Sequence, residues 1–409
     1  MNLRITAATL LLTAACTAEG SDPQLFPPSF GNDPEDVDEP YDEDEPADAP
    51  PEPGDPPPPE EPPADNADAL DAYILSLGHL NIPPIAAKHE IQCPGVCASW
   101  QDGALICEES YFSETDHYDS FIALQPNSPA LWPGAVLRSD ELDGGFLSPI
   151  GVPRAPATFS LSLENLTAAP AGMMEAPSLS SFRSLRNEIL AEGVHGATPA
   201  QITYEINAVN SKSQLAVKLG AGVDWSGVVD LDAMFDFSDA STTNKYLFDF
   251  TQTYYTADLD TPVRPSALFE SSAEVVELEA FMGPDNPPTY VQSVSYGRRV
   301  LFGIESNEAL EVIVASVNAA IAQVVNVDAG GNNTDALTSA KITASVLGGD
   351  GDAAVKTVLG VEQLLQFITA GGNYSAESPG VPIAYKLAYL DNVPARLALT
   401  SEYPEVLCQ

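Results

Sequence analysis

The 409-residue chain carries 59 acidic against 16 basic side chains, a net charge of −43, and contains 36 prolines. So acidic a composition argues against nucleic-acid binding, because affinity for phosphates comes from Lys and Arg, and against electrostatic docking to anionic lipid. Residues 1–65 account for −16 of the charge, which leaves −27 on residues 66–409, a stretch long enough for two or three packed domains.

The amino terminus has the architecture of an export signal. One positive charge, Arg4, precedes an apolar run from Ile5 to Ala15 that is followed by Cys16. A cysteine in this position is typical of a bacterial lipoprotein, so we expect residues 1–16 to be a lipoprotein signal peptide and Cys16 to be lipidated; an ordinary signal peptide cut nearby is the alternative. The protein is then exported, and is either lipid-anchored at the outer membrane or cell surface or released.

Residues 17–67 form the next expected part of the chain. Within them, residues 21–65 hold 16 acidic residues and 15 prolines without a single Lys or Arg. A segment of this composition buries too little apolar surface to offset the entropy of ordering, and its charges repel one another. We therefore expect a disordered, extended tether.

Four further cysteines follow: Cys93, Cys97, Cys107 and Cys408. An even number in an exported protein predicts two disulfides, for which three pairings exist. The short, hairpin-like stretch between Cys97 and Cys107 favours a bridge between those two. A metal site at Cys93 and Cys97 is a weaker alternative, because the spacing is unusual and the compartment is oxidising.

The spacing of apolar residues predicts helices over 178–192 and 355–368 and half-buried strands over 246–254 and 294–304. The fold class is therefore α+β with an antiparallel sheet. The acidic run 114–119 is expected to be a solvated loop. The four histidines lie apart, and no nucleophile elbow, phosphate loop or dinucleotide motif occurs, so we expect neither an enzyme nor a bound cofactor or metal.

Residues 215–237 alternate without a break, with an apolar residue or Gly at every odd position. This length fits two membrane strands of about 9 to 11 residues, apolar toward lipid and polar toward a water-filled lumen. A long bent strand or hairpin packed on a core is the alternative. The lipid-facing candidates are Leu215, Val217, Leu219, Val223, Trp225, Val229, Leu231 and Phe235. The lumen-facing candidates are Lys218, Asp224, Asp230, Asp232 and Asp236.

A second region, 310–324, fits a helical stripe and a strand face equally well, and residues 340–346 alternate again. Two segments long enough for an amphipathic hairpin therefore flank the predicted strands at 246–304. A soluble protein can store such segments as helices and release them as strands.

Several short motifs resemble, in order along the chain, the cholesterol-dependent or thiol-activated cytolysins. They are Trp132-Pro133-Gly134-Ala135, residues 211–214, residues 252–256, Tyr296-Gly297-Arg298, residues 346–350 with Gly348, Gly349 and Asp350, and residues 382–392. The resemblance runs from about residue 70 to residue 405 and is strongest after residue 200.

This resemblance implies a twisted antiparallel sheet flanked by two helical clusters, at 207–237 and 306–342, which unfurl into two membrane hairpins per subunit after ring assembly. It implies that Gly348 and Gly349 are a hinge, at which an edge strand swings away so that the next subunit can pair. The implied division is 68–203 for mainly domains 1 and 2, 204–348 for mainly domain 3, 349–392 for a return to domains 1 and 3, and 393–409 for a last domain 2 strand.

Two departures from the family are expected. The sequence ends near the point where the family's fourth, membrane-recognising domain begins, so direct cholesterol binding is not implied. The family's aromatic pair that sets strand register between subunits falls on Asn210 and Ile342. The chain resembles short cytolysin-like proteins that lack the fourth domain, some of which act with a longer partner subunit.

Two functions follow as hypotheses. The first is a pore-forming protein, or the co-subunit of a two-component pore, whose partners are membrane lipid, copies of itself and a longer cytolysin-like subunit. The second is a non-lytic surface lipoprotein that uses the scaffold as a binding module. The first hypothesis predicts that residues along 215–237 are exposed alternately to lipid and to water on membranes. The second predicts that the protein stays monomeric under all conditions.

Overall fold

The structure is a computed structural model that describes residues 66–140, 142, 146–220, 234, 235, 237, 243–324, 334–347, 356–358, 361–370 and 372–408. Cys16 and most of the tether lie outside these residues. So do the hinge residues Gly348 and Gly349, the motif residue Asp350, the lipid-facing candidates Val223, Trp225, Val229 and Leu231, and the lumen-facing candidates Asp224, Asp230, Asp232 and Asp236.

Two long strands form the centre of the larger sheet, β9 (Asn244–Leu259) and β10 (Thr289–Ser306). They contain both segments for which alternation predicted a strand. The sheet runs β12-β11-β10-β9-β6-β7, and every pairing in it is antiparallel. The predicted α+β class with an antiparallel sheet is confirmed.

The other strands of this sheet are short. Their bounds are β4 (Phe121–Ile122), β5 (Val136–Leu137), β6 (Ala157–Leu161), β7 (Ala171–Met174), β8 (Gln201–Ala208), β11 (Lys341–Leu347), β12 (Lys356–Val358) and β13 (Val381–Tyr389). β8 pairs with β9, β5 with β10, and β13 with both β10 and β4.

A β-bulge at Gly297 divides β9 and β10 into two halves. The pairing register shifts between Tyr296 and Gly297. On one side of the bulge the two strands pair with β6 and β13, and on the other side with β8 and β11. We call the second side, with β8, β11, β12 and the adjoining parts of β9 and β10, the helix-covered half. Bulges bend and twist a strand pair, so the two halves are free to differ in direction.

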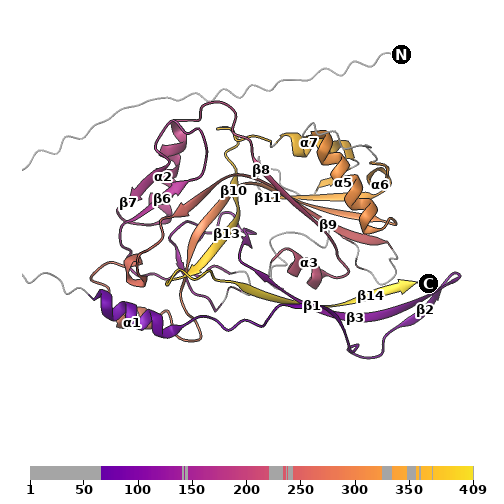
Figure 1. Cartoon of the computed structure of the whole chain (residues 1–409), viewed down its shortest axis with the longest axis horizontal. Helices are drawn as coiled ribbons and strands as arrows, with labels where there is room; N and C mark the ends of the chain where they lie inside the picture. The colour runs from indigo at the N-terminus through magenta and orange to yellow at the C-terminus, as the bar shows by residue number, and fades with distance from the viewer. Residues whose placement is uncertain are drawn as a thin grey trace, which may run out of the picture. The chain divides into compact units, whose positions relative to one another are not determined.

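Helices cover both faces of this half. On one face lie α5 (Leu310–Val324), α6 (Asp335–Thr338) and α7 (Val361–Ala370), gathered together in Figure 1. On the other face lies α3 (Lys212–Lys218) with Met234 and Phe235. The faces follow from the alternation of the strands, because Phe248 and Phe302 point to the α5 side and Leu247 and Leu301 to the α3 side.

A smaller, elongated sheet is formed by β1 (Ala86–Ile91), β2 (Ser99–Asp102), β3 (Leu105–Tyr118) and β14 (Leu397–Cys408), as Figure 1 shows. β3 pairs with β1, β2 and β14, all antiparallel. The prediction of a solvated loop over 114–119 is wrong for residues 114–118, which form the last part of β3. The long partner strand β14, nearly 300 residues away, supplies the backbone hydrogen bonds.

The remaining helices are α1 (Ala67–Leu77), α2 (Leu179–Ala191), α4 (Val275–Glu279) and the 3₁₀ helix η2 (Pro265–Leu268). α2 confirms the helix predicted over 178–192, and its capping box joins Ser178 and Ser181. The helix predicted over 355–368 is partly wrong, because residues 356–358 form β12 on the edge of β11 and the helix begins at Val361. Within the described residues, no helix has the length and apolarity to cross a bilayer.

The predicted Cys97–Cys107 bridge is wrong, because Cys97 is bonded to Cys93. The register of the β2–β3 pair explains this, since it places Trp100 rather than Cys97 opposite Cys107. Cys107 is itself disulfide-bonded and fully buried. Its register partner on the other side of β3 is Cys408 of β14.

Candidate functional site

The first alternating segment begins as a short buried helix. The Ser211 hydroxyl caps α3 by accepting a hydrogen bond from the Gln214 backbone N–H at 3.1 Å. Leu215, Val217 and Leu219 are at most 3 % exposed. Leu215 and Leu219 belong, with Phe235, to the core on this side of the sheet. The described lipid-facing candidates are therefore all withdrawn from solvent.

An ion-pair cluster holds the end of α3 to the smaller sheet. The Lys218 Nζ lies 3.0 Å from the carboxylate of Asp116 and 3.2 Å from that of Glu114, both on β3. Burial lowers the pKa of Lys218, but its hydrogen bond to Asp116 and the charges of both carboxylates outweigh burial and raise the pKa overall. Lys218, a lumen-facing candidate, is thus charged and partnered here.

Further polar contacts join the same segment to β14. The Asn210 side-chain amide donates to the Glu405 carboxylate at 3.0 Å, and the Ser213 hydroxyl donates to the Glu402 backbone carbonyl at 3.2 Å. Together with the Lys218 cluster, these bonds tie α3 to the smaller sheet. α3 therefore leaves its position only when contacts to both sheets break.

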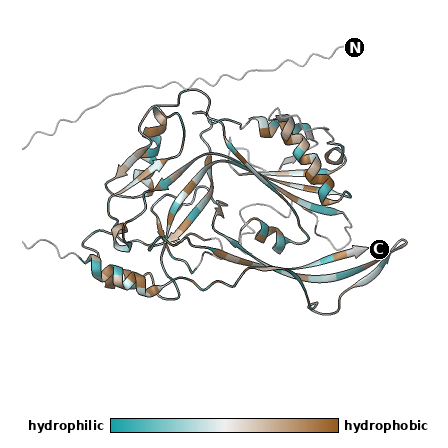
Figure 2. Ribbon diagram, in the orientation of Figure 1, coloured by the Kyte–Doolittle hydropathy of each residue, from teal (hydrophilic) through white to brown (hydrophobic). Residues whose placement is uncertain are grey.

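The second segment lies on the opposite face as α5 and α6. Ile313, Val317, Ala320 and Leu337 are completely buried against the large sheet. The Tyr204 hydroxyl on β8 donates to the Asn318 side chain on α5 at 2.8 Å. Figure 2 shows hydrophobic residues, in brown, on both α3 and α5. The region that fitted helix or strand equally well is a helix in this structure.

The two edges of the helix-covered half differ. β8 is one edge, paired only with β9 among the described strands. The other edge, β11, is covered by the three-residue strand β12, with Thr357 opposite Thr343. A strand edge with unpaired backbone groups is a template for another chain, so β12 decides whether β11 is available.

The motif residues Tyr296 and Arg298 lie beside the bulge. Tyr296 stacks on Tyr255 with ring centres 5.0 Å apart, and burial raises the pKa of its hydroxyl. The Arg298 guanidinium lies 4.1 Å from the ring centre of Phe367 on α7. Arg298 thus joins β10 to the helix that follows β12.

The side chains that hold α3 and α5 in place were not predicted from the sequence. Glu114 and Asp116 lie about 100 residues from Lys218, and Tyr204 lies 114 residues from Asn318. A single sequence offers no signal for such pairs beyond the presence of opposite charge. Among the residues that the structure describes, no three His, Cys, Asp or Glu side chains come together as metal ligands do.

Comparisons with known proteins add to this geometry. The family described as thiol-activated cytolysin matches residues 104–409. Pneumolysin of Streptococcus pneumoniae is 31% identical over 289 residues, which are 68% of this chain and 61% of pneumolysin. Listeriolysin O of Listeria monocytogenes is 26% identical over 359 residues, 83% of this chain and 66% of listeriolysin O.

A solved structure described as the human-specific toxin intermedilysin matches with a TM-score of 0.70 at 26% identity, over 84% of this chain and 75% of that one. Of the curated relative pneumolysin, by comparison, the chain spans less than two thirds of the length.

Proposed function

Because the chain belongs to the thiol-activated cytolysin family, we propose that it forms pores in membranes, alone or as a co-subunit, by assembling into rings and converting two stored segments into β-hairpins. The observation that carries this proposal is the storage of the first segment. Leu215, Val217 and Leu219 alternate along the sequence as a membrane strand requires, yet all three are buried, the first two within α3 and Leu219 at its C-terminal end.

Storage on opposite faces of one sheet suits such a conversion. Both segments continue directly from strands of the helix-covered half, α3 after β8 and α5 after β10. If each helix unfolds and extends its strand, the hairpins lengthen the existing sheet without a change of topology. The apolar residues that leave the core then need a new apolar partner, which the bilayer supplies.

The two edges of this half supply the route to a ring. In our proposal β12 leaves β11, at a hinge formed by Gly348 and Gly349, and β8 of the next subunit takes its place. Direct cholesterol binding is not part of the proposal. A longer cytolysin-like subunit is the partner we propose for recruitment, and intermedilysin, solved in a complex with human CD59, is a relative that binds a protein.

We also propose that Cys16 carries a lipid and that residues 17–67 are a spacer between the membrane and the folded part. We assign 68–203 mainly to domains 1 and 2, 204–348 mainly to domain 3, 349–392 to domains 1 and 3, and 393–409 to domain 2. The pairing of β14 with β3 supports placing 393–409 together with part of 68–203.

Liposomes loaded with a dye test the proposed function. The mature protein is added with and without the products of neighbouring genes, over a range of lipid compositions. We expect dye release together with ring-shaped oligomers in electron micrographs. A protein that stays monomeric and releases no dye under every condition contradicts pore formation and supports the alternative of a non-lytic binding module.

A further inference from the structure

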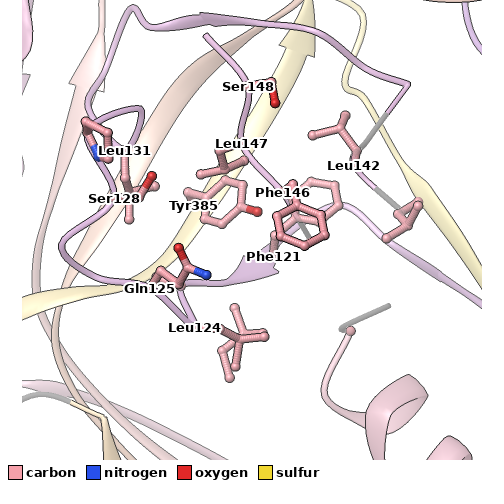
Figure 3. Close-up of a pocket in the computed structure, with 15 residues that line it drawn as sticks. Phe121, Leu124, Gln125, Ser128, Leu131, Leu142, Phe146, Leu147, Ser148 and Tyr385 are labelled. Atoms are coloured by element: carbon pink, nitrogen blue, oxygen red, sulfur yellow. The ribbon is translucent and has the colours of Figure 1, made fainter. Parts of the chain in front are cut away.

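A cavity of about 240 Å³ lies where the two sheets and the end of α3 meet. Its lining comes from segments that are far apart in the sequence, including β4, the stretch 123–131, Gly220, Tyr385 of β13 and Leu397 of β14. Figure 3 shows this cavity. At roughly 30 Å³ for each water-sized atom, the volume takes about eight non-hydrogen atoms.

Polar and apolar groups contribute nearly equally to the surface of the lining. Leucine and phenylalanine side chains predominate, and Gln125, Ser128 and Ser148 are the polar side chains beside Tyr385. No Asp, Glu, Lys, Arg or His is among the lining residues that the structure describes. Small-molecule sites combine apolar side chains with a few polar groups that fix the orientation of the ligand.

Tyr385 gives the cavity a polar end. The side chain is 6 % exposed and its ring stacks on Phe121, with ring centres 5.3 Å apart. In Figure 3 its hydroxyl points into the space beside Phe146. Burial raises the pKa of this hydroxyl. A phenolic O–H donates a hydrogen bond, so it can pair with an oxygen of a ligand that lies in this space.

We propose that this cavity binds an uncharged amphiphile, a free small molecule with a hydrocarbon body of about seven or eight carbons and one hydroxyl that pairs with Tyr385. An anionic or cationic head group is disfavoured, because it loses its hydration and finds no opposite charge among the described lining residues. Medium-chain alcohols and alkylphenols have the required size and polarity. This site is separate from the β11 edge and from the stored helices themselves.

Occupancy has a consequence for the first segment. Gly220, the residue after Leu219, forms part of one wall, and Leu397 of the smaller sheet forms part of another. A ligand that contacts both stabilises the state in which α3 is packed, because those contacts exist together only in that state. The ligand therefore opposes release of α3. This last step rests on the proposed function, whereas binding itself does not.

Calorimetric titration of the full chain with 1-octanol, and separately with octanoate, tests the site. We expect saturable one-to-one binding of octanol and at least tenfold weaker binding of octanoate. Tyr385→Phe keeps the ring and is expected to weaken octanol binding by about 2- to 12-fold, the equivalent of one hydrogen bond. Leu124→Trp fills the cavity and is expected to abolish binding. Leu75→Trp, on the exposed side of α1, is the matched control and should bind as the unchanged protein does.

Octanol that does not saturate, octanoate that binds equally well, or Tyr385→Phe that binds as tightly as the unchanged protein overturns the site. Hydrogen exchange at the α3 amides tests the consequence without any membrane. We expect exchange to slow when octanol is bound and to stay the same in Leu124→Trp. If octanol binds but exchange at the α3 amides does not slow, the link between the cavity and α3 is overturned. If exchange slows but the protein releases no dye from liposomes under any condition, only the proposed pore function is contradicted.

Discussion

A disulfide that joins β12 to β11 is expected to abolish dye release and ring completion, and a reductant to restore both. Thr343 and Thr357 are register partners in this antiparallel pair, and residues directly opposite each other have Cβ atoms about 4.5 to 5.5 Å apart, close enough to be bridged with a small adjustment. The double variant Thr343→Cys with Thr357→Cys holds β12 in place covalently. Under oxidising conditions we expect dye release at the level of liposomes without protein.

The two single variants are the controls, because each carries the same substitution without the bridge and should release dye as the unchanged protein does. The unchanged protein is also measured with reductant, since reduction breaks the Cys93–Cys97 bond and the disulfide of Cys107 as well. Full activity of the oxidised double variant, with the bridge verified by mass spectrometry, shows that β12 need not move and contradicts the proposed route to a ring.

Gly297→Ala is expected to lower the free energy of unfolding by about 3 kcal/mol or more, at the upper end of what overpacking costs. A Cβ at this position lies 2.0 Å from the backbone oxygen of Gln252 and 3.0 Å from the Cα of Thr253. Both belong to the central strand β9, so neither yields by a rotation of a side chain. The Cα of Gly297 also lies 2.7 Å from the position of a Cβ on Gly380.

Urea unfolding followed by circular dichroism measures this change. Gly151→Ala is the matched control, because nothing lies within 4 Å of its added Cβ, and its stability should stay within about 0.5 kcal/mol. Equal stability of the two variants contradicts this prediction. It means that β9 and β10 separate easily at the bulge, and that the close approach of Gly297 to the Gln252 backbone has no structural role.

The central strands were predictable because alternate side chains of each strand point to opposite faces of the sheet. One face packs into the core on the α5 side and the other into the separate core on the α3 side. The alternating residues of the two strands belong to one continuous core, which contains Tyr246, Phe248, Phe250, Val300, Phe302 and Ile304. The same signal at 215–219 does not describe the structure of α3. There the helix lies between two sheets, so that Gln214 and Ala216 are buried together with Leu215, Val217 and Leu219.

The contacts that store the segments were not predictable, because they depend on which distant strands lie beside each other. The pairing of β3 with β14 brings Glu114, Asp116 and Glu405 to the side that faces α3. The register of β2 and β3 likewise places Trp100, and not Cys97, opposite Cys107. In a chain with many acidic residues, charge alone does not select Lys218 and its two partners.

The measurement that tests the central claim most directly is single-cysteine labelling along 215–237 with a dye whose emission reports its surroundings, before and after assembly on liposomes. Before assembly, we expect the dye at Leu215, Val217 and Leu219 to report a dry protein core. After assembly, we expect odd positions to report lipid and even positions, including Ala216 and Lys218, to report water. Uniformly aqueous emission from all positions in assembled rings contradicts the conversion of this segment into a membrane strand.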